Sequence, residues 1–384
     1  MRHGNVPESS RPVRLLIVCS TLHIGGAEQV AASIAKNVES RHFHVQVCCL
    51  KENGVVGRSI QAQGISLRTL GKPSSGHIDR LTSLKLLSLI RREKIDVIHT
   101  HDVHGLMDAS VCRRVCGDVR HVHTFHFGNY PNRDRSSWRA ERLCWRSPDA
   151  LVAVGHVQAE KIQDLYAIPK SRLRVIWNGV ESGSLAPACD RRLLLDGPRP
   201  VVLSVSTLIE QKGIANLLQA ARLLKNEGYR FRLIIAGHGH LRDSLEQMSR
   251  SLAINDRVEF LGWVPNAAQR ILPACDVFVQ SSLWEAMSVV VLEAMAAARP
   301  LVVTRVGENE HVIEHERSGL VVPPSDARAL ADALAKVLTD DALAARLGQS
   351  ARRRYLERFT MQPMLDAYEA LYLELADSIR SRRA

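Results

Sequence analysis

The first half of the chain alternates short apolar runs with amphipathic segments. Its first run, 13–20 (VRLLIVCS), is almost continuously apolar, as expected of a strand buried on both faces of a sheet. A loop then leads into 27–38, whose apolar residues have helical spacing. The same pattern predicts further strands at 45–49, 97–99, 119–124, 150–154 and 174–176, with helices between them.

The alternation restarts after an irregular stretch that contains Pro and Gly. Strands are predicted at 201–205, 231–236, 258–261, 276–280 and 301–304. Because alternating strands and helices favour parallel sheets covered on both faces, we expect an α/β protein with two doubly wound, Rossmann-like domains and a ligand cleft between them. The predicted boundaries are 1–182 and 200–360, with a linker at 183–199 and a final helix, 361–384, that folds back on the first domain.

Composition narrows the class of protein. With 46% hydrophobic and 24% charged residues, the chain is typical of a globular protein and not of a collagen-like or disordered one. The polar opening residues have no apolar core of a secretory signal, and no apolar run is long enough to span a bilayer. Eight cysteines without a Cys-x-x-Cys pair indicate reduced thiols. We therefore predict a cytoplasmic protein.

Two glycines follow the first predicted strand. Gly25 and Gly26 stand where a helix begins, so their backbone N–H groups could approach an anion closely, with the helix dipole assisting. The loop is not Gly-x-Gly-x-x-Gly and the Walker pattern is absent, so neither a nicotinamide cofactor nor a P-loop site is supported. A tight turn without a ligand is the alternative.

Two carboxylates form the most specific pattern, Glu285-x7-Glu293. Within one helix they would lie about 12 Å apart along the axis. That exceeds the separation of about 5–9.5 Å used by glycoside hydrolases. If Glu285 precedes the helix, both carboxylates can face one cleft and suit two hydroxyl-rich ends of a long ligand. The alternative is a capping Glu followed by an exposed helical Glu.

The glycine loop and the Glu285-x7-Glu293 pattern occur together with other motifs in a defined order over about 300 residues. This ordered set resembles that of the glycosyltransferases of family 4, which have the two-domain GT-B architecture. No single motif is as specific as the ordered set. The matching segments are 25–28 (GGAE), 96–101 (DVIHTH), 124–126 (TFH), 175–180 (VIWNGV), 212–213 (KG), 236–239 (AGHG), 260–264 (FLGWV) and 285–293 (EAMSVVVLE).

The resemblance implies a retaining enzyme that moves a sugar from a nucleotide-diphosphate sugar to a saccharide or lipid-linked acceptor, in surface polysaccharide or lipopolysaccharide synthesis. Glu293 would bind the ribose hydroxyls, Glu285 would face the transferred sugar, and Lys212 would neutralise the leaving diphosphate. His126 would lie near the reactive carbon of the sugar. No metal is expected, and no Asp-x-Asp motif occurs. Backbone groups of both domains would complete the donor site: Gly25, Gly26, Gly262, Val264, Ser288 and Val289.

The chain departs from the family at the diphosphate loop. Thr207 stands where the family usually has an arginine, and a threonine hydroxyl does not replace a bidentate guanidinium. Loss of one such donor can cost about 3 kcal/mol of transition-state stabilisation. Either Lys212 supplies most of the stabilisation of the diphosphate, or Arg305 takes the place of the missing arginine, or the enzyme has low activity. The Ala-Met-Ser that follows Glu285, in place of Gly-Phe-Gly, leaves the donor sugar open.

Two further carboxylates follow the strand predicted at 301–304. Glu308 occupies the second place of a Gly-Gly turn in the family pattern, and Glu310 matches a Glu that is common after this turn. Glu310 is a candidate site residue, with a helix N-terminal cap as the alternative.

Histidines gather at the ends of two predicted strands. We expect them to line the cleft as polar groups, with acceptor binding and a metal cluster as alternatives, and His101 is the one assigned to the acceptor side. The set is His99, His101, His104, His121 and His123.

The positive charge is concentrated in the first domain. The chain has a net charge of +11, and residues 1–182 hold 26 basic and 16 acidic side chains, against 25 and 24 in 183–384. A basic face on the acceptor domain would attract an anionic membrane surface, and Trp138 and Trp145, among nearby arginines, would form an interfacial segment. A solvated basic surface is the alternative.

Three other functions fit part of the pattern. A nucleotide-sugar epimerase would share the fold, and a noncatalytic nucleotide-sugar-binding subunit would tolerate Thr207. A nucleic-acid binder is suggested by charge alone, and we expect no nucleic-acid partner because the chain has no recognised binding motif and only 5% aromatic residues.

Overall fold

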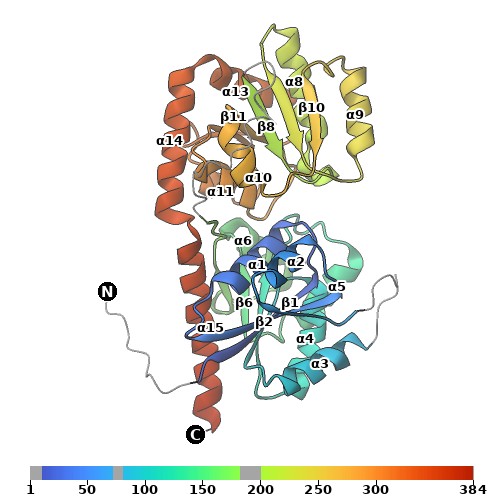
Figure 1. Ribbon diagram of the computed structural model, residues 1–384, viewed down its shortest axis with the longest axis vertical. Helices are drawn as coiled ribbons and strands as arrows, with labels where there is room; N and C mark the ends of the chain where they lie inside the picture. The colour runs from blue at the N-terminus through green and yellow to red at the C-terminus, as the bar shows by residue number, and fades with distance from the viewer. Residues whose placement is uncertain (1–10, 72–80, 182–199, 384) are drawn as a thin grey trace.

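The computed structural model describes residues 11–71, 81–181 and 200–383. These residues form two α/β domains that lie one above the other, with two long C-terminal helices along one side of both (Figure 1). The segment 183–199, where the linker is predicted, lies outside the described residues.

The N-terminal domain contains a seven-stranded sheet in the order β3-β2-β1-β4-β5-β6-β7, and all its strand pairs are parallel. The interior strand β1 is buried along nearly its whole length, as its apolar run predicts. The strands are β1 Val13–Thr21, β2 Phe43–Glu52, β3 Ser66–Thr69, β4 Val97–Thr100, β5 Arg120–Phe125, β6 Ala150–Ala153 and β7 Leu173–Val175. The α-helices are α1 Gly26–Asn37, α2 Val55–Gln61, α3 Thr82–Arg92, α4 Val103–Val115, α5 Arg135–Cys144 and α6 His156–Tyr166.

The C-terminal domain repeats this plan with six parallel strands in the order β10-β9-β8-β11-β12-β13. The strands are β8 Val201–Val205, β9 Arg232–Ala236, β10 Val258–Gly262, β11 Val277–Gln280, β12 Leu301–Thr304 and β13 Leu320–Val322. A 3₁₀ turn, η2, spans Glu210–Lys212. The α-helices are α8 Ile214–Asn226, α9 Arg242–Ser251, α10 Ala267–Arg270, α11 Val289–Ala296, α12 Asn309–Val312 and α13 Ala327–Thr339.

Both sheets reverse their strand order beside their first strand, between β1 and β4 and between β8 and β11. Loops at the carboxyl ends of strands beside such a reversal form the ligand crevice of doubly wound sheets. The structure therefore confirms the predicted fold class. The edge strands β3 and β13 lie outside the predicted strands. Three of the four residues of β3 are exposed, so β3 has no apolar run, and β13 ends directly before Pro323.

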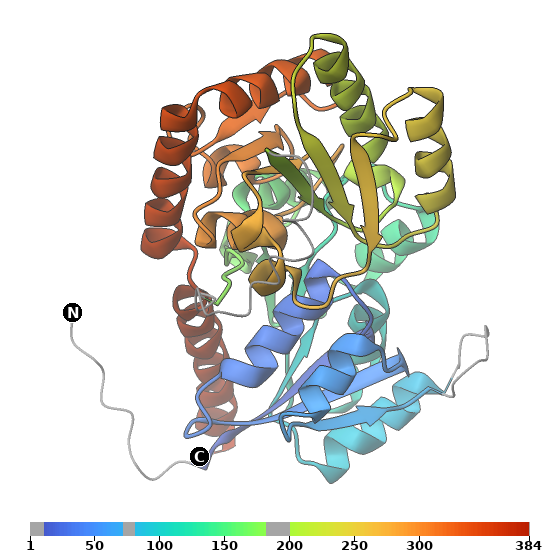
Figure 2. The same cartoon turned by 45° about the horizontal axis from the view of Figure 1, so that its top comes forward.

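The last two helices cross from one domain to the other. Helix α14 (Asp341–Arg358) packs on the C-terminal domain, and α15 (Met361–Arg383) packs on the N-terminal sheet (Figures 1 and 2). The Tyr355 hydroxyl donates to the carbonyl of Val180 at 2.9 Å where the chain crosses. Apolar burial ties α15 to the first domain. Its buried residues include Met364, Leu365, Tyr368, Leu371 and Tyr372.

Candidate active site

A lysine and a glutamate form an ion pair in the C-terminal domain, in loops that follow β8 and β11. Lys212 Nζ lies 2.6 Å from Glu285 Oε1, and Glu285 is only 7% exposed. The same carboxylate accepts from Ser282 Oγ at 2.8 Å and from Gln211 Nε2 at 3.3 Å. Gly213, at φ +59°, ends the Lys212 turn in a conformation that other residues rarely adopt. The structure thus brings two predicted site residues together, with the Lys212 ammonium positioned where an incoming anion would compete for it.

The N-terminus of α11 lies beside this pair. Ser288 is its N-cap residue and makes no side-chain cap hydrogen bond, and the first turn contains no acidic residue. The first N–H groups of a helix have no partner within the helix, so they are available to an anion. Across the cleft, a β-carbon added at Gly26 would lie 3.9 Å from Val289 Cγ2. The glycine loop and the helix start therefore face each other, as a diphosphate held by both domains would require.

The segment that follows Glu285 also touches the N-terminal domain. A β-carbon added at Gly128 would lie 2.2 Å from the Glu285 carbonyl carbon, so the two backbones meet at a distance that only glycine permits. Asn178 donates from Nδ2 to the carbonyl of Met287 at 3.2 Å. Sequence reasoning missed Gly128 and the role of Asn178. The sequence feature that could have indicated the role of Asn178 is its position within the VIWNGV segment.

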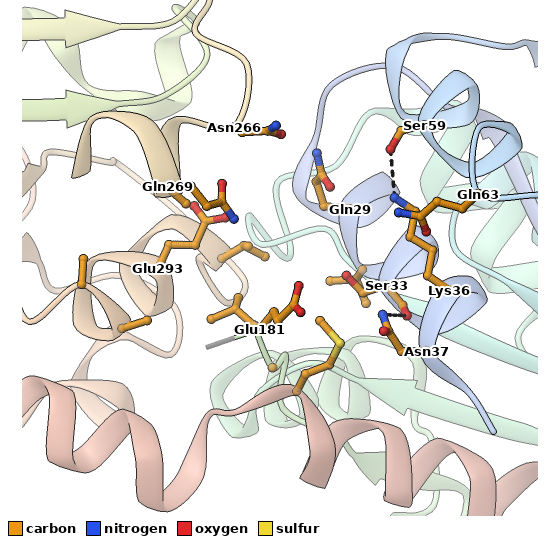
Figure 3. Close-up of a pocket in the computed structure, with 18 of the residues that line it drawn as sticks. Gln29, Ser33, Lys36, Asn37, Ser59, Gln63, Glu181, Asn266, Gln269 and Glu293 are labelled. Atoms are coloured by element: carbon orange, nitrogen blue, oxygen red, sulfur yellow. Dashed lines mark hydrogen bonds between the residues drawn. The ribbon is translucent and has the colours of Figure 1, made fainter. Parts of the chain in front are cut away.

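Glu293 lines a polar cavity of about 480 Å³ between the two domains. Figure 3 shows Glu293 and Gln269 on one wall, opposite Gln29, Ser33 and Lys36 of α1. Burial raises the pKa of Glu293 to about 7 and lowers that of Lys36. Hydroxyl and amide groups dominate the wall on α1, so the cavity suits a ligand rich in hydroxyl groups.

His126 is partly buried beside the cleft. Its Nε2 lies 2.9 Å from Nδ1 of His101, and burial lowers the pKa of His126 to about 4. The imidazole is therefore neutral near pH 7 and can act there as a hydrogen-bonding group. Burial also lowers the pKa of His101, whose Nε2 is buried without a hydrogen-bond partner.

The expectation that all the clustered histidines line the cleft is wrong. His99, His121 and His123 are at most 1% exposed, because they lie on β4 and β5 inside the domain. His99 bonds to the Tyr372 hydroxyl of α15 at 2.7 Å, and Thr100 bonds to His121 and His123 at 2.9 Å each. Burial lowers the pKa of all three. They are hydrogen-bonded core residues.

The remaining predicted donor residues of the C-terminal domain lie at or just after the carboxyl ends of strands β8 and β10. Thr207 is partly exposed after β8. Gly262 has φ +75°, its carbonyl accepts from the amide of Gly237 at 2.7 Å, and Val264 packs against the domain core. None of these contacts identifies the nucleobase of the donor, so the role of these residues in donor binding stays a prediction.

The carboxylates after β12 separate into two environments. Glu310 is about half exposed and lies 3.3 Å from Arg305 Nε, which engages Arg305 in a surface ion pair. Glu308 is fully buried and contacts the N-terminal domain. Among the described residues, no group of three His, Cys, Asp or Glu side chains is arranged to hold a metal ion.

The C-terminal domain carries an ion pair and a helix start without a side-chain cap, and Glu293 lines a polar cavity between the two Rossmann-like domains. These features define a two-domain α/β protein whose site suits an anionic, hydroxyl-rich ligand. Residues 24–183 match glycosyltransferase family 4, and residues 188–354 match the glycosyl transferases group 1. The chain therefore belongs to the glycosyltransferases of family 4, which have the GT-B fold.

Similar proteins include two named glycosyltransferases and a solved structure. An Escherichia coli UDP-Gal:alpha-D-GlcNAc-diphosphoundecaprenol alpha-1,3-galactosyltransferase is 26% identical over 92% of this chain and 94% of its own length. The lipopolysaccharide core biosynthesis glycosyltransferase LpsE of Rhizobium meliloti is 29% identical over 76% of this chain and 80% of its own length. The Anabaena HepE structure with UDP and glucose superposes with a TM-score of 0.84 at 19% identity, covering 94% of this chain and all of HepE.

Proposed function

We propose that this glycosyltransferase is a retaining, metal-independent enzyme that transfers a hexose from a UDP-sugar to a lipid-linked saccharide in surface-glycan assembly. The observation that carries the proposal is the Lys212–Glu285 pair beside the uncapped start of α11, opposite the Gly25-Gly26 loop. A UDP donor is supported by the named donor of the Escherichia coli relative and by the UDP in the HepE structure.

The leaving diphosphate is stabilised by groups that the chain itself supplies. As the bond from the sugar to the diphosphate breaks, negative charge grows on the diphosphate oxygens. The Lys212 ammonium and the free N–H groups of α11 offset this charge without any reorganisation of solvent. These cationic and amide donors support a reaction that needs no divalent ion.

The acceptor side is formed by the N-terminal domain. His126, neutral because of its lowered pKa, is hydrogen-bonded to His101 and can bond a sugar hydroxyl. Glu285 faces the transferred sugar from the opposite domain once the diphosphate has drawn Lys212 away. A lipid-linked saccharide is supported by the diphosphoundecaprenol acceptor named for the relative from Escherichia coli.

Transfer from UDP-galactose and UDP-glucose, compared with GDP- and ADP-sugars, tests the reaction. We expect turnover with a UDP-sugar and a diphosphoundecaprenol-linked GlcNAc acceptor, in buffer containing a chelator, and nuclear magnetic resonance should show a product with the anomeric configuration of the donor. Donor binding without turnover would indicate a noncatalytic subunit, and donor isomerisation without transfer would indicate an epimerase. Either result would refute the proposal.

A surface on the N-terminal domain suits attachment to an anionic membrane. Among the described residues, no helix is long and apolar enough to cross a bilayer. The neighbouring helices α3, α4 and α5 (Figure 1) nevertheless expose apolar side chains that include a stripe with i, i+4 spacing along α4. This α3–α5 surface consists of Leu84, Met107, Val111, Val115 and Leu143.

Exposed arginines accompany the α3–α5 surface on the same helices. Each arginine near an anionic bilayer contributes about 1 kcal/mol to binding, so we infer a location on the cytoplasmic face of a membrane that contains anionic lipid. The tryptophan segment predicted from sequence is wrong, because Trp145 is 4% exposed and Trp138 is partly buried against the same core, whereas Leu143 is 76% exposed. The exposed arginines are Arg91, Arg92, Arg114, Arg135, Arg139 and Arg142.

Flotation with vesicles tests the α3–α5 surface. We expect the protein to float with vesicles containing phosphatidylglycerol, to be released by high salt, and to bind pure phosphatidylcholine weakly. A Met107→Ser, Val111→Ser variant should float less, whereas Leu356→Ser, which changes an exposed leucine on α14, should float like the wild type. Absence of flotation, or an equal loss in both variants, would contradict a membrane role for this surface.

A further inference from the structure

Glu308 of the C-terminal domain is buried against the N-terminal domain. Its side chain is 0% exposed and lies in the loop between β12 and α12. Oε1 accepts from the backbone amide of His156 at 2.8 Å and from the indole Nε1 of Trp177 at 3.0 Å, and Oε2 accepts from the amide of Val157 at 3.1 Å. All three donors belong to the other domain.

The helix that receives Glu308 has no cap of its own. His156 and Val157 are the first two residues of α6, its N-cap residue is Gly155, and its first turn contains no acidic residue. The first four N–H groups of a helix lack intrahelical acceptors, and a carboxylate at this end also interacts favourably with the helix dipole. A β-carbon at Gly155 would lie 2.4 Å from Glu308 Oε2, so this position leaves space for the foreign carboxylate.

The same loop supports the backbone of the sugar-facing segment. The Glu308 amide donates to the carbonyl of Ala286 at 2.9 Å. A β-carbon at Gly307, which has φ +52°, would lie 2.3 Å from the Glu285 carbonyl oxygen. Since Gly128 of the N-terminal domain contacts the same peptide, Glu285 lies between a loop tied to α6 and a glycine of the opposite domain.

The contact also lies beside the crossing between the domains. The Trp177 ring packs against Phe359, with 5.4 Å between ring centroids, and edge-on against His156 at 5.5 Å. Phe359 is fully buried at the end of α14, just before α15 begins. His311 Nδ1 lies 3.8 Å from Glu308 Oε1, beyond hydrogen-bond distance. A change at Glu308 therefore acts where the two domains are joined.

We propose that Glu308 is a positioning residue that acts as an interdomain cap: its carboxylate holds the start of α6, through His156, Val157 and Trp177, and thereby fixes Glu285 against the N-terminal domain for catalysis. The effect on catalysis rests on the proposed function, whereas the cap itself does not. The buried carboxylate of Glu308 thereby adds a hydrogen-bonded link between the two domains.

Hydrogen–deuterium exchange resolved to single amides tests the cap without any ligand. The amides of His156 and Val157 have no acceptor within α6, so their protection reports whether Glu308 is in place. In Glu308→Gln, which removes the charge and presents an amide donor to these amides, we expect exchange about tenfold faster than in the wild type. Gly155→Ala, which places a methyl group against Oε2, should give the same result from the opposite domain.

Glu160→Gln is the matched control. Glu160 is exposed on α6 and has no contact with Glu308 in the structure, so its loss of charge should leave the His156 and Val157 amides protected. Equal exchange in the wild type and in folded Glu308→Gln and Gly155→Ala proteins would overturn the cap. Faster exchange in Glu160→Gln as well would also overturn it, because charge on α6 would then explain the effect.

Kinetics test the positioning role. With UDP-galactose as donor, we expect kcat of Glu308→Gln to fall by about 10- to 100-fold while KM for the donor changes little, because the donor nucleotide is held in the C-terminal domain. Lost protection with an unchanged kcat would refute the positioning role. If the wild type transfers no sugar at all, the proposed function fails, and the exchange result still decides whether the cap exists.

Discussion

Replacement of Glu293 by glutamine should stabilise the protein and impair donor binding, both in a pH-dependent way. Burial raises the pKa of Glu293 from 4.5 to about 7, which corresponds to a penalty of about 3 kcal/mol on the ionised folded state. Because the side chain is only partly buried, solvent reduces this value. The penalty is absent below pH 4.5, grows as pH rises toward 7, and is complete above 7.

Urea denaturation at pH 5.5 and pH 8 measures this effect. We expect Glu293→Gln to have a higher unfolding free energy than the wild type at pH 8, by up to about 3 kcal/mol, and a smaller advantage at pH 5.5. Glu160→Gln, at an exposed position, should match the wild type at both values. An equal change in Glu293→Gln at the two pH values would refute the assignment of a raised pKa to this carboxyl.

Donor affinity should depend on pH in the opposite sense to stability. Ribose hydroxyls donate to the ionised carboxylate, and with a pKa near 7 the ionised fraction of Glu293 rises about tenfold between pH 6 and pH 8. Calorimetry with UDP-glucose, whose diphosphate has no terminal phosphate to titrate, should therefore show about tenfold tighter binding at pH 8. Glu293→Gln should bind weakly at both values. Unchanged affinity in this variant would remove the ribose assignment.

Three further substitutions address the diphosphate loop and the last helix. Lys212→Ala should lower kcat/KM by about 100-fold or more in a transfer assay, because it removes the cation paired with Glu285, and near-normal activity would contradict its role. Thr207→Arg should preserve or raise kcat, and complete loss would mean that the loop has another geometry. Leu371→Ala, at a fully buried position on α15, should lower the unfolding free energy by about 2–5 kcal/mol, whereas Leu356→Ala, at 52% exposure, should change it by about 0.5 kcal/mol or less.

Local patterns were sufficient for the elements that form the two sheets. The buried strands β1 and β8 carry continuous apolar runs, and their spacing with intervening helices predicts parallel, doubly wound sheets. The edge strands β3 and β13 are missed because β3 exposes three of its four residues and β13 ends directly before Pro323, so neither shows the long apolar run of a buried strand. The family resemblance named Lys212 and Glu285 as candidate site residues, although only their loops in the folded chain bring the two charges to 2.6 Å.

Burial of polar side chains could not be predicted in the same way. His99 and His121 end up inside the N-terminal domain, and Trp145 packs in its core while Leu143 faces solvent. Each outcome depends on strand register and on which helix covers which face. These are properties of residues far apart in the chain, so a local pattern of polar and apolar residues does not determine them.

By itself, the sequence determined the alternation of strands and helices, the two-domain α/β class and the places where candidate donor-site residues follow strands, because these depend on composition and periodicity within short segments. The tertiary structure alone decided which loops of the two domains touch. It placed Gly26 opposite Val289, Gly128 against Glu285, and Glu308 at the start of α6. Contacts between domains depend on the relative position of two separately formed sheets, which no single segment encodes.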